Sequence, residues 1–185
     1  LLMGSLSVPV LAHTPHSQKK YSVVCVGFYN LENLFDTEVD PDTSKILQDD
    51  FTPDGPKAFT KERYQEKLKN MAKVIADLGT ATTPDGPAVL GVCEIENRKV
   101  LEDLVKEPAI AGRNYKIVHY ESPDRRGIDV ALLYQEKYFK VTSSKSFTIK
   151  SDIENFITRD QLLVSGEVDG ETMHFMVAHW PSRRG

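Results

Sequence analysis

The stretch AVLGVCE, residues 88–94, is the part of this sequence that decides the fold. It is a continuous apolar run that ends in Glu94, with the turn sequence PDGP before it and a segment of helical spacing at 97–104 after it. A short apolar run bounded by turn signals is typical of a buried strand. Open α/β sheets bind their ligands at the C-terminal ends of strands. Glu94 is therefore either a solvated acid or a carboxylate placed to bind a ligand such as Mg²⁺ or Ca²⁺.

The composition is that of a globular domain with its own core. The chain has 185 residues, of which 40% are hydrophobic and 27% charged, and its formal net charge is −4. A chain of this length can bury a substantial core. The negative charge argues against a general polyanion-binding surface but allows local basic clusters. No stretch of the sequence is long and apolar enough to be expected to span a membrane.

The first twelve residues, LLMGSLSVPVLA, have the character of the end of a signal peptide. Val10 and Ala12 are small and have the spacing of a cleavage site. The alternative is a packed or flexible N-terminal arm. If the segment is a signal remnant, the mature protein starts near His13, residues 13–20 form a flexible N-terminus, and the protein works in the periplasm or is secreted.

The rest of the sequence, residues 21–185, predicts a single domain of strands with two helices. Strands are expected at 21–30, 88–93, 115–120, 128–134 and 139–142, with 146–149 as a further candidate, and a hairpin at 161–168 and 172–179. Helices are expected at 60–78 and 98–106. Residues 36–59 have no clear period and predict a long loop, which is typically functional or disordered. This order favours an α+β fold of two stacked sheets with helices outside over a doubly wound sheet.

The two cysteines, Cys25 and Cys93, lie inside strand-like runs. If the two strands end level with each other, the thiols are offset by about 13 Å along the strands. This offset exceeds the reach of a disulfide. Both residues are therefore expected to be free, buried thiols.

Polar residues come directly after the first predicted strand. Strand alternation places Asn30 and Glu32 on one side and Leu31 on the other. An amide oxygen and a carboxylate, together with Glu94, form a sensible site for a hard metal ion and a phosphate group.

Five motifs in this order resemble the endonuclease/exonuclease/phosphatase superfamily, which includes deoxyribonuclease I, abasic-site endonucleases, and inositol-phosphate and sphingomyelin phosphodiesterases. The motifs are NLE at 30–32, Glu94 at a strand end, RGIDVALLY at 126–134, TRD at 158–160 and HWPSRRG at 179–185. The resemblance runs from about residue 23 to residue 185. It implies a deoxyribonuclease I-like, two-sheet β-sandwich flanked by helices, incomplete in this chain, which carries the N-terminal portion.

The resemblance also implies a metal site. Glu94 matches the principal Mg²⁺ ligand, with Mn²⁺ or Ca²⁺ as alternatives, and Glu32 matches an acidic position that helps to bind the metal. Asn30 matches an asparagine near the metal and the phosphate. His179 matches a histidine that contacts the scissile phosphate. Glu32 as the acceptor of a loop hydrogen bond, and His179 as a core histidine, remain open alternatives.

Three arginines are implied to bind substrate phosphate: Arg159, Arg126 and Arg183. Arg126 and Arg183 could equally be solvated charges. Asp129, which lies in the same segment as Arg126, is expected to be a structural hydrogen-bonding residue.

The expected function is metal-dependent hydrolysis of phosphoester bonds, in a nuclease or in a phosphodiesterase or phosphatase. Two later motifs of the family, Asp-x-Asn and Asp-His, do not occur in these 185 residues. In the family they orient and activate the attacking water, so this chain is expected to be inactive without the C-terminal remainder of its domain. The substrate is a nucleic acid or a lipid or inositol phosphate, and the negative charge favours the latter. A non-catalytic member that binds a phosphate-bearing ligand or a protein remains the alternative.

Overall fold

The computed structural model describes residues 21–150, 152 and 156–180 of the chain. The predicted signal remnant and flexible N-terminus, residues 1–20, lie outside the described part. Within that part, no helix has the length and apolar character needed to cross a membrane.

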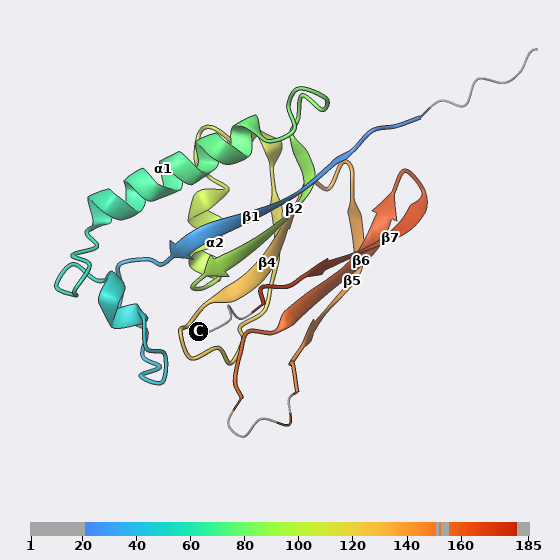
Figure 1. The fold of residues 1–185 in the computed structure, drawn as a ribbon. Helices are drawn as coiled ribbons and strands as arrows, with labels where there is room; N and C mark the ends of the chain where they lie inside the picture. Colours follow the sequence, from blue (N-terminus) through green and yellow to red (C-terminus); the bar gives the residue numbers. More distant parts are fainter. Residues whose placement is uncertain (1–20, 151, 153–155, 181–185) are drawn as a thin grey trace, which may run out of the picture.

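The first sheet has four strands in the order β1-β2-β4-β3 (Figure 1). They are β1 (Cys25–Leu34), β2 (Pro87–Ile95), β3 (Lys116–His119) and β4 (Asp129–Tyr134). β1 runs parallel to β2, whereas β4 is antiparallel to both of its neighbours. The predicted apolar strand therefore lies in the interior of the sheet, and β1 lies at its edge.

The second sheet is an antiparallel meander of β5 (Lys140–Phe147), β6 (Gln161–Val168) and β7 (Glu171–Val177). β6 and β7 join at Asp169 and Gly170, both with positive φ, as a tight hairpin turn requires. The predicted hairpin is confirmed. The predicted break at residues 143–145 is wrong, because β5 is one continuous strand. Its polar residues alternate along a largely exposed strand and do not interrupt it.

Two helices cover the face of the first sheet that points away from the second sheet (Figure 1). α1 (Lys61–Asp77) begins at Thr60, whose side chain accepts a hydrogen bond from the Arg63 backbone, and it buries the predicted apolar stripe. α2 (Arg98–Leu104) begins at Asn97, which caps it in the same way. Short 3₁₀ turns lie at Gln48–Phe51 and Ala111–Arg113.

Two apolar cores hold these layers together. The first lies between the helices and the first sheet, and the second lies between the two sheets. β2 supplies both cores, with Leu90, Val92 and Ile95 facing the helices and Val89 and Cys93 facing the second sheet. A strand buried on both faces explains why its sequence is a continuous apolar run. The expected mixed α/β architecture of two stacked sheets with outer helices is confirmed.

Gly91 of the interior strand β2 lies beneath a contact between the two sheets. A Cβ atom at this position would lie 3.1 Å from Phe28 Cδ2 of β1 and 3.2 Å from Val177 Cγ2 of β7. Both side chains therefore pack over the bare glycine backbone, and any larger residue would push them apart.

Both cysteines are free, as expected. In the parallel register, Cys25 pairs with Pro87 and Cys93 pairs with Asn30, so the two thiols lie at different levels of the sheet. The prediction that both are buried holds only for Cys93. Cys25 lies near the start of the edge strand and is only half-buried.

The 36–59 segment is a loop with a 3₁₀ turn, and its aromatic residues are part of the first core. Phe51 stacks on Phe35 with ring centroids 4.5 Å apart and meets Phe59 edge to face at 5.5 Å. All three rings are buried. This aromatic packing gives the loop a defined course between β1 and α1.

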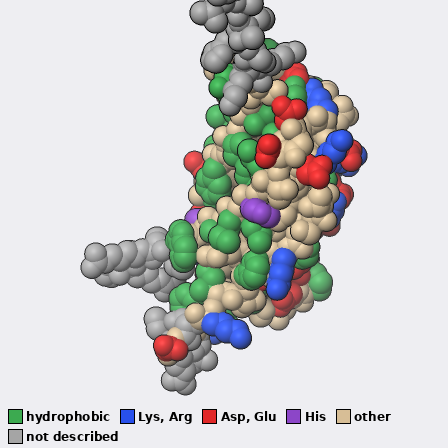
Figure 2. Space-filling model, turned by 90° about the vertical axis from the view of Figure 1, so that its right-hand side faces the viewer, with side chains coloured by type: hydrophobic (Ala, Val, Ile, Leu, Met, Phe, Trp, Pro, Cys, Tyr) green, Lys and Arg blue, Asp and Glu red, His purple; other side chains and the backbone are tan. Residues whose placement is uncertain are grey.

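Hydrophobic side chains gather in a band on the face shown in Figure 2. Among the large apolar residues, Val26 and Phe28 of β1 are 52% and 55% exposed, and Met176 of β7 is 60% exposed. β1 and β7 are both edge strands. Large apolar side chains on unpaired edges are characteristic of surfaces that contact another part of the protein or a partner.

Candidate active site

β1 and β2 both leave regular strand geometry at their C-terminal ends. After Asn30 pairs with Cys93, the next aligned pair is Leu34 with Ile95, so the intervening residues bulge out. Glu94 has a φ of 59° and is also an extra residue relative to β4. Bulges and left-handed backbone at non-glycine residues are strained, and they concentrate at functional sites.

The approach of Glu32 to Asn30 comes from a turn, not from strand alternation. Glu32 and Asn33 have φ values of 50° and 58°, and the Glu32 backbone N–H donates to Asn30 Oδ1 at 2.7 Å. An asparagine side chain that binds the backbone two residues on favours this kind of turn. The expected strand alternation therefore does not hold at Glu32, and a shared metal site of the Asn30 and Glu32 side chains stays a prediction.

Glu94 stands at the centre of the cluster. Its Oε2 accepts a hydrogen bond from the Asn33 backbone N–H at 3.1 Å, and its Oε1 lies 3.5 Å from His179 Nε2. The side chains of His179 and Glu94 are 21% and 15% exposed, so both reach solvent from a mostly covered position. The structure thus brings together the ends of β1, β2 and β7, as the motifs predicted.

Lys67 of α1 is a member of this cluster that the sequence did not reveal. Its Nζ donates to the carbonyl oxygens of Glu32 and Asn33, the latter at 3.0 Å. Burial lowers the pKa of Lys67, while the nearby carboxylates of Glu32 and Glu94 oppose that shift. The sequence offered no signal for this role, because a lysine beside a helix's apolar stripe normally points to solvent.

The surroundings of His179 favour its neutral form. Burial lowers its pKa, and the guanidinium group of Arg159 lowers it further, whereas Glu94 acts in the opposite direction. Its Nδ1 atom is buried and has no hydrogen-bond partner among the described residues. A neutral imidazole can donate one hydrogen bond and accept another, so this ring can bind a phosphate oxygen.

Arg159 is buried beneath the end of β7. Its Nε and one terminal nitrogen donate to the backbone oxygens of His179 at 2.6 Å and Trp180 at 2.9 Å, and the other bonds Asp124 at 3.1 Å. These contacts position the segment that carries His179. Direct contact of Arg159 with phosphate stays a prediction.

Arg126 is the more accessible arginine. It is half-buried, and its Nε lies 3.6 Å from Asp124 Oδ1. It is close enough to His179 to contribute to its lowered pKa. The third predicted arginine, Arg183, lies outside the described residues.

The thiol of Cys93, next to Glu94, has no nucleophilic role in this arrangement. Burial raises its pKa to about 12. The group therefore stays protonated at neutral pH and acts as part of the core between the sheets.

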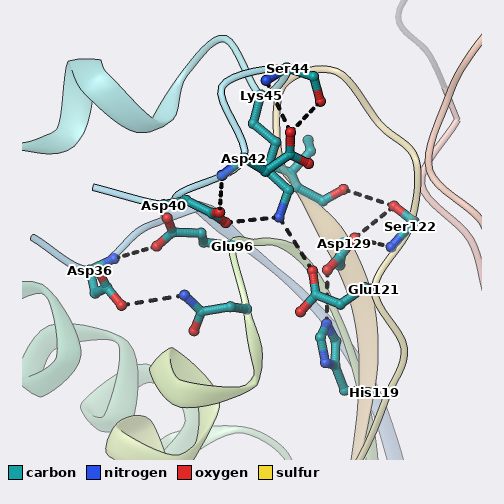
Figure 3. Close-up of polar contacts among 12 residues, drawn as sticks. Asp36, Asp40, Asp42, Ser44, Lys45, Glu96, His119, Glu121, Ser122 and Asp129 are labelled. Carbon is teal, nitrogen blue, oxygen red and sulfur yellow. Dashed lines mark hydrogen bonds and ion pairs between the residues drawn. The ribbon is translucent and has the colours of Figure 1, made fainter. Parts of the chain in front are cut away.

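A second group of ionisable side chains lies beyond the ends of β3 and β4 (Figure 3). The potential ligand atoms of His119, Glu121 and Asp129 lie within 4.8 Å of one another. Asp129 bonds His119 Nε2 at 2.9 Å and accepts two hydrogen bonds from Ser122, and Glu121 lies 3.4 Å from Lys45 Nζ. The structure therefore gives Asp129 the structural hydrogen-bonding role expected of it. Its carboxylate bonds His119 and Ser122, and the Glu121 carboxylate lies beside Lys45.

Lys45 ties the 36–59 loop to this second group. Its Nζ also bonds Asp40 at 3.0 Å, and the next backbone N–H, that of Ile46, donates to Arg125 O at 2.7 Å. On the same side, the buried Glu96 carboxylate accepts a hydrogen bond from the Asp36 backbone at 2.8 Å (Figure 3). These contacts fix the course of the loop alongside the candidate site.

The sequence model of the endonuclease/exonuclease/phosphatase family matches residues 25–185. The chain belongs to this family. The match includes both strand-end bulges, the Arg126 segment and His179, so the cluster around Glu94 lies inside the endonuclease/exonuclease/phosphatase domain. A comparison with curated proteins gives no match.

Among solved structures, this chain is similar to D. rerio TDP2 complexed with a single-strand DNA product, at 17% sequence identity and a TM-score of 0.44. The match covers 63% of this chain and 41% of that one. It is similar to ANGEL2, a 2′,3′-cyclic phosphatase, at 13% identity and a TM-score of 0.45, with coverages of 82% and 39%. It is also similar to an endonuclease/exonuclease/phosphatase from Bacteroides vulgatus, at 13% identity and a TM-score of 0.45, with 81% of this chain and 48% of that one covered. The chain thus spans less than half the length of these proteins.

Glu94, Glu32 and Asn30 have the side-chain chemistry that suits a hard divalent cation, and their joint binding of one ion stays a prediction. Glu94 and Glu32 offer carboxylate oxygens, and Asn30 offers an amide oxygen, which is the donor set that Mg²⁺ or Ca²⁺ prefers. The Oδ1 atom of Asn33, whose backbone binds Glu94, is buried without a hydrogen-bond partner among the described residues. A buried oxygen without a partner is suited to accept a bound water or to face a cation.

Proposed function

We propose that the protein is a Mg²⁺-dependent phosphoesterase that hydrolyses phosphoester bonds at the cluster around Glu94. The observation that carries this proposal is the placement of Glu94 between the Asn33 backbone N–H, at 3.1 Å, and His179 Nε2, at 3.5 Å. One carboxylate oxygen is fixed by the backbone, and the other faces a neutral imidazole. Family membership supports the reaction class.

Each residue has a distinct task in the proposed reaction. Glu94, with Glu32 or Asn30, holds the metal ion, Mg²⁺ or alternatively Mn²⁺ or Ca²⁺. When bound, that ion supplies charge stabilisation to the phosphoryl group and the leaving oxygen. His179 donates a hydrogen bond to a non-bridging phosphate oxygen, and Arg126 provides a positive charge for another. Those contacts orient the phosphate for in-line attack.

Water activation is assigned to the remainder of the protein. The described residues place no carboxylate–histidine unit that could act as a general base beside His179, and the motif Asp-His does not occur in the sequence. The 185-residue chain alone is therefore expected to be inactive. The exposed apolar side chains of edge strands β1 and β7 support a contact between this part and the rest of the domain.

Two substrate classes fit this mechanism, nucleic acids and lipid or inositol phosphates. The net charge of −4 favours the smaller or lipid-borne phosphate, because long nucleic-acid grooves are usually basic. An extracytoplasmic location, inferred from residues 1–12, is part of the same proposal.

The test is cleavage by the full-length protein. Plasmid DNA, a phosphoinositide and bis(p-nitrophenyl) phosphate are assayed in parallel with Mg²⁺ and with EDTA. Glu94→Gln is expected to lower metal-dependent turnover at least about 100-fold, as the loss of a main electrostatic group does. The matched control is Glu102→Gln, an exposed carboxylate of α2 that pairs with Arg98. If Glu94→Gln retains metal-dependent turnover, the assignment of Glu94 as a metal ligand is wrong. If the wild-type protein binds no metal, a non-catalytic binding protein is favoured.

A further inference from the structure

A cavity of about 440 Å³ opens directly beside Glu32, between the loop that precedes α1 and the helix itself. Its wall includes the aromatic residues Phe51 and Phe59, whose rings meet edge to face at 5.5 Å. Because both rings are buried in the core, this wall is rigid. The cavity shares Glu32 with the candidate metal site, so a ligand in it can be part of the molecule that is cleaved.

Three cationic side chains converge on this cavity: Lys57, Arg63 and Lys67. The Lys57 ammonium lies 5.2 Å from the ring centroid of Phe51, and the Arg63 guanidinium lies 6.0 Å from that of Phe59. None of the three forms an ion pair with another residue of the described part. The cavity therefore has positive charges that the fold does not neutralise by direct pairing.

The loop that carries Lys57 is held in place by Arg63. The Arg63 guanidinium donates hydrogen bonds to the backbone oxygens of Lys57 and Ala58, the latter at 3.1 Å. The Lys57 backbone N–H donates to Asp50 O at 3.2 Å. The side chain of Lys57 is exposed and free to contact a ligand, while its backbone is fixed on both sides.

The ammonium groups of Lys57 and Lys67 both border the cavity, and like charges repel each other. Lys67 Nζ is held in this position by the carbonyl oxygens of Glu32 and Asn33. An anion placed between the two groups would relieve this repulsion. Glu32 lies at the end nearest the metal site, and Glu66 lies on the exposed helix face, so the cavity still has an excess of one cation.

We propose that this cavity binds a second phosphate group of the substrate, next to the one that is cleaved. The inference rests on the proposed phosphoesterase activity and names its substrate class, a compound with two neighbouring phosphate groups. Lys57 is the residue that selects it, because its ammonium group is accessible and is not engaged in the metal site. The same chemistry is present in a 5′-phosphorylated nucleotide chain and in a phosphorylated inositol headgroup.

The first test uses substrate pairs that differ by one phosphate group. Full-length protein is assayed on thymidylyl-thymidine with and without a 5′-phosphate, and on glycerophosphoinositol with and without a 4-phosphate. Lys57→Met keeps the apolar stem over Phe51 but removes the charge. It is expected to lower kcat/KM about tenfold for the doubly phosphorylated member of the recognised pair, through KM, a change worth about 1.4 kcal/mol. The other member and bis(p-nitrophenyl) phosphate change less than twofold.

The substrate pair in which Lys57→Met lowers kcat/KM for the doubly phosphorylated member shows whether the second phosphate belongs to a nucleotide chain or to an inositol headgroup. The control is Lys69→Met, an exposed lysine on the same helix, which should leave all substrates unchanged. Equal losses on both members of a pair, or no loss on any substrate, overturn the inference while leaving the phosphoesterase assignment intact.

A second measurement does not depend on activity. Inorganic phosphate is titrated into the protein in EDTA, and the backbone amide resonances of residues 57–63 are followed by NMR. Shifts in the wild type that disappear in Lys57→Met support the cavity as a phosphate site even if no substrate is cleaved. Absence of such shifts in the wild type overturns the inference, and absence of turnover with the shifts present overturns only the proposed function.

Discussion

The backbone N–H of Asn33 donates a hydrogen bond to Glu94 Oε2 at 3.1 Å, and both residues have left-handed backbone, with φ values of 58° and 59°. Two strained positions on neighbouring strands thus hold each other. A carboxylate fixed by a backbone donor cannot rotate away without losing that bond. The bulges of β1 and β2 therefore determine the direction in which Glu94 points, which regular strands would not do.

Asn33 provides a direct test of this backbone geometry. Asn33→Gly is expected to change the free energy of unfolding by less than about 0.5 kcal/mol, because glycine adopts positive φ without strain. Asn33→Ala should destabilise the protein by about 1 kcal/mol or more, because left-handed backbone is costly for a residue with a Cβ atom. Urea denaturation of the two variants measures the difference. Equal stability of both would show that the turn is not strained.

Lys67 is expected to act as a positioning residue for Glu32 and Asn33. On bis(p-nitrophenyl) phosphate, which has no second phosphate group, Lys67→Met removes both hydrogen bonds to these carbonyl oxygens and should lower kcat about tenfold, with little change in KM, a loss that corresponds to about 1.4 kcal/mol. Lys67→Arg, which keeps a donor, should recover part of the loss. Steady-state kinetics of the full-length protein, with Lys69→Met as control, check this. A loss that appears only in KM would instead indicate a direct substrate contact.

Arg159 should matter for stability more than any exposed arginine. Arg159→Met leaves the buried Asp124 carboxylate without its main partner, which is expected to cost about 3–5 kcal/mol of unfolding free energy. Arg125→Met, an exposed neighbour of Asp124, should stay within about 0.5 kcal/mol of the wild type. Chemical denaturation measures both. A cost below about 1 kcal/mol for Arg159→Met would contradict the structural role and restore direct phosphate binding as its main task.

The buried carboxyl group of Glu96 should make the free energy of unfolding depend on pH. Burial raises its pKa from the usual 4.5 to about 7, so between these pH values the folded protein binds more protons than the unfolded chain. The stabilisation is complete below pH 4.5 and is lost as the pH rises through 7, with a slope of up to about 1.4 kcal/mol per pH unit. Glu96→Gln keeps an acceptor for the Asp36 backbone and should flatten this slope. Unfolding of metal-free protein at several pH values, with Glu136→Gln as control, tests it.

Much of the fold could be predicted because local signals agreed with tertiary packing. Thr60 begins α1 as its capping chemistry requires, and the Asp169-Gly170 turn joins β6 to β7. The apolar run of β2 is buried on both faces. The predicted division of β5 is wrong, because the polar residues of this strand do not interrupt it, and Ser144 and Ser146 bond Tyr120 and Asp160.

The sequence could predict the side chains at the strand ends of the candidate site, but not the contacts of Lys67 that hold the turn at Glu32 in place. Asn30 and Glu94 lie near the C-terminal ends of the neighbouring strands β1 and β2, and His179 follows β7, so the topology places them at one end of the sheets. The left-handed turn at Glu32 is favoured locally by the Asn30 side chain, but the contact of Lys67 with that turn has no local signature. That contact depends on how α1 packs near the end of β1, which is a property of the tertiary structure.

Gly91 has a consequence for chemistry that lies well beyond its own position. Phe28 of β1 and Val177 of β7 both pack over it, and His179 comes two residues after Val177, the last residue of β7. An alanine at position 91 would act as a spacer between the sheets and lengthen the 3.5 Å gap from His179 to Glu94. The absence of a side chain at Gly91 therefore sets the spacing between the two sheets, and with it the distance between Glu94 of the first sheet and His179 beyond the second.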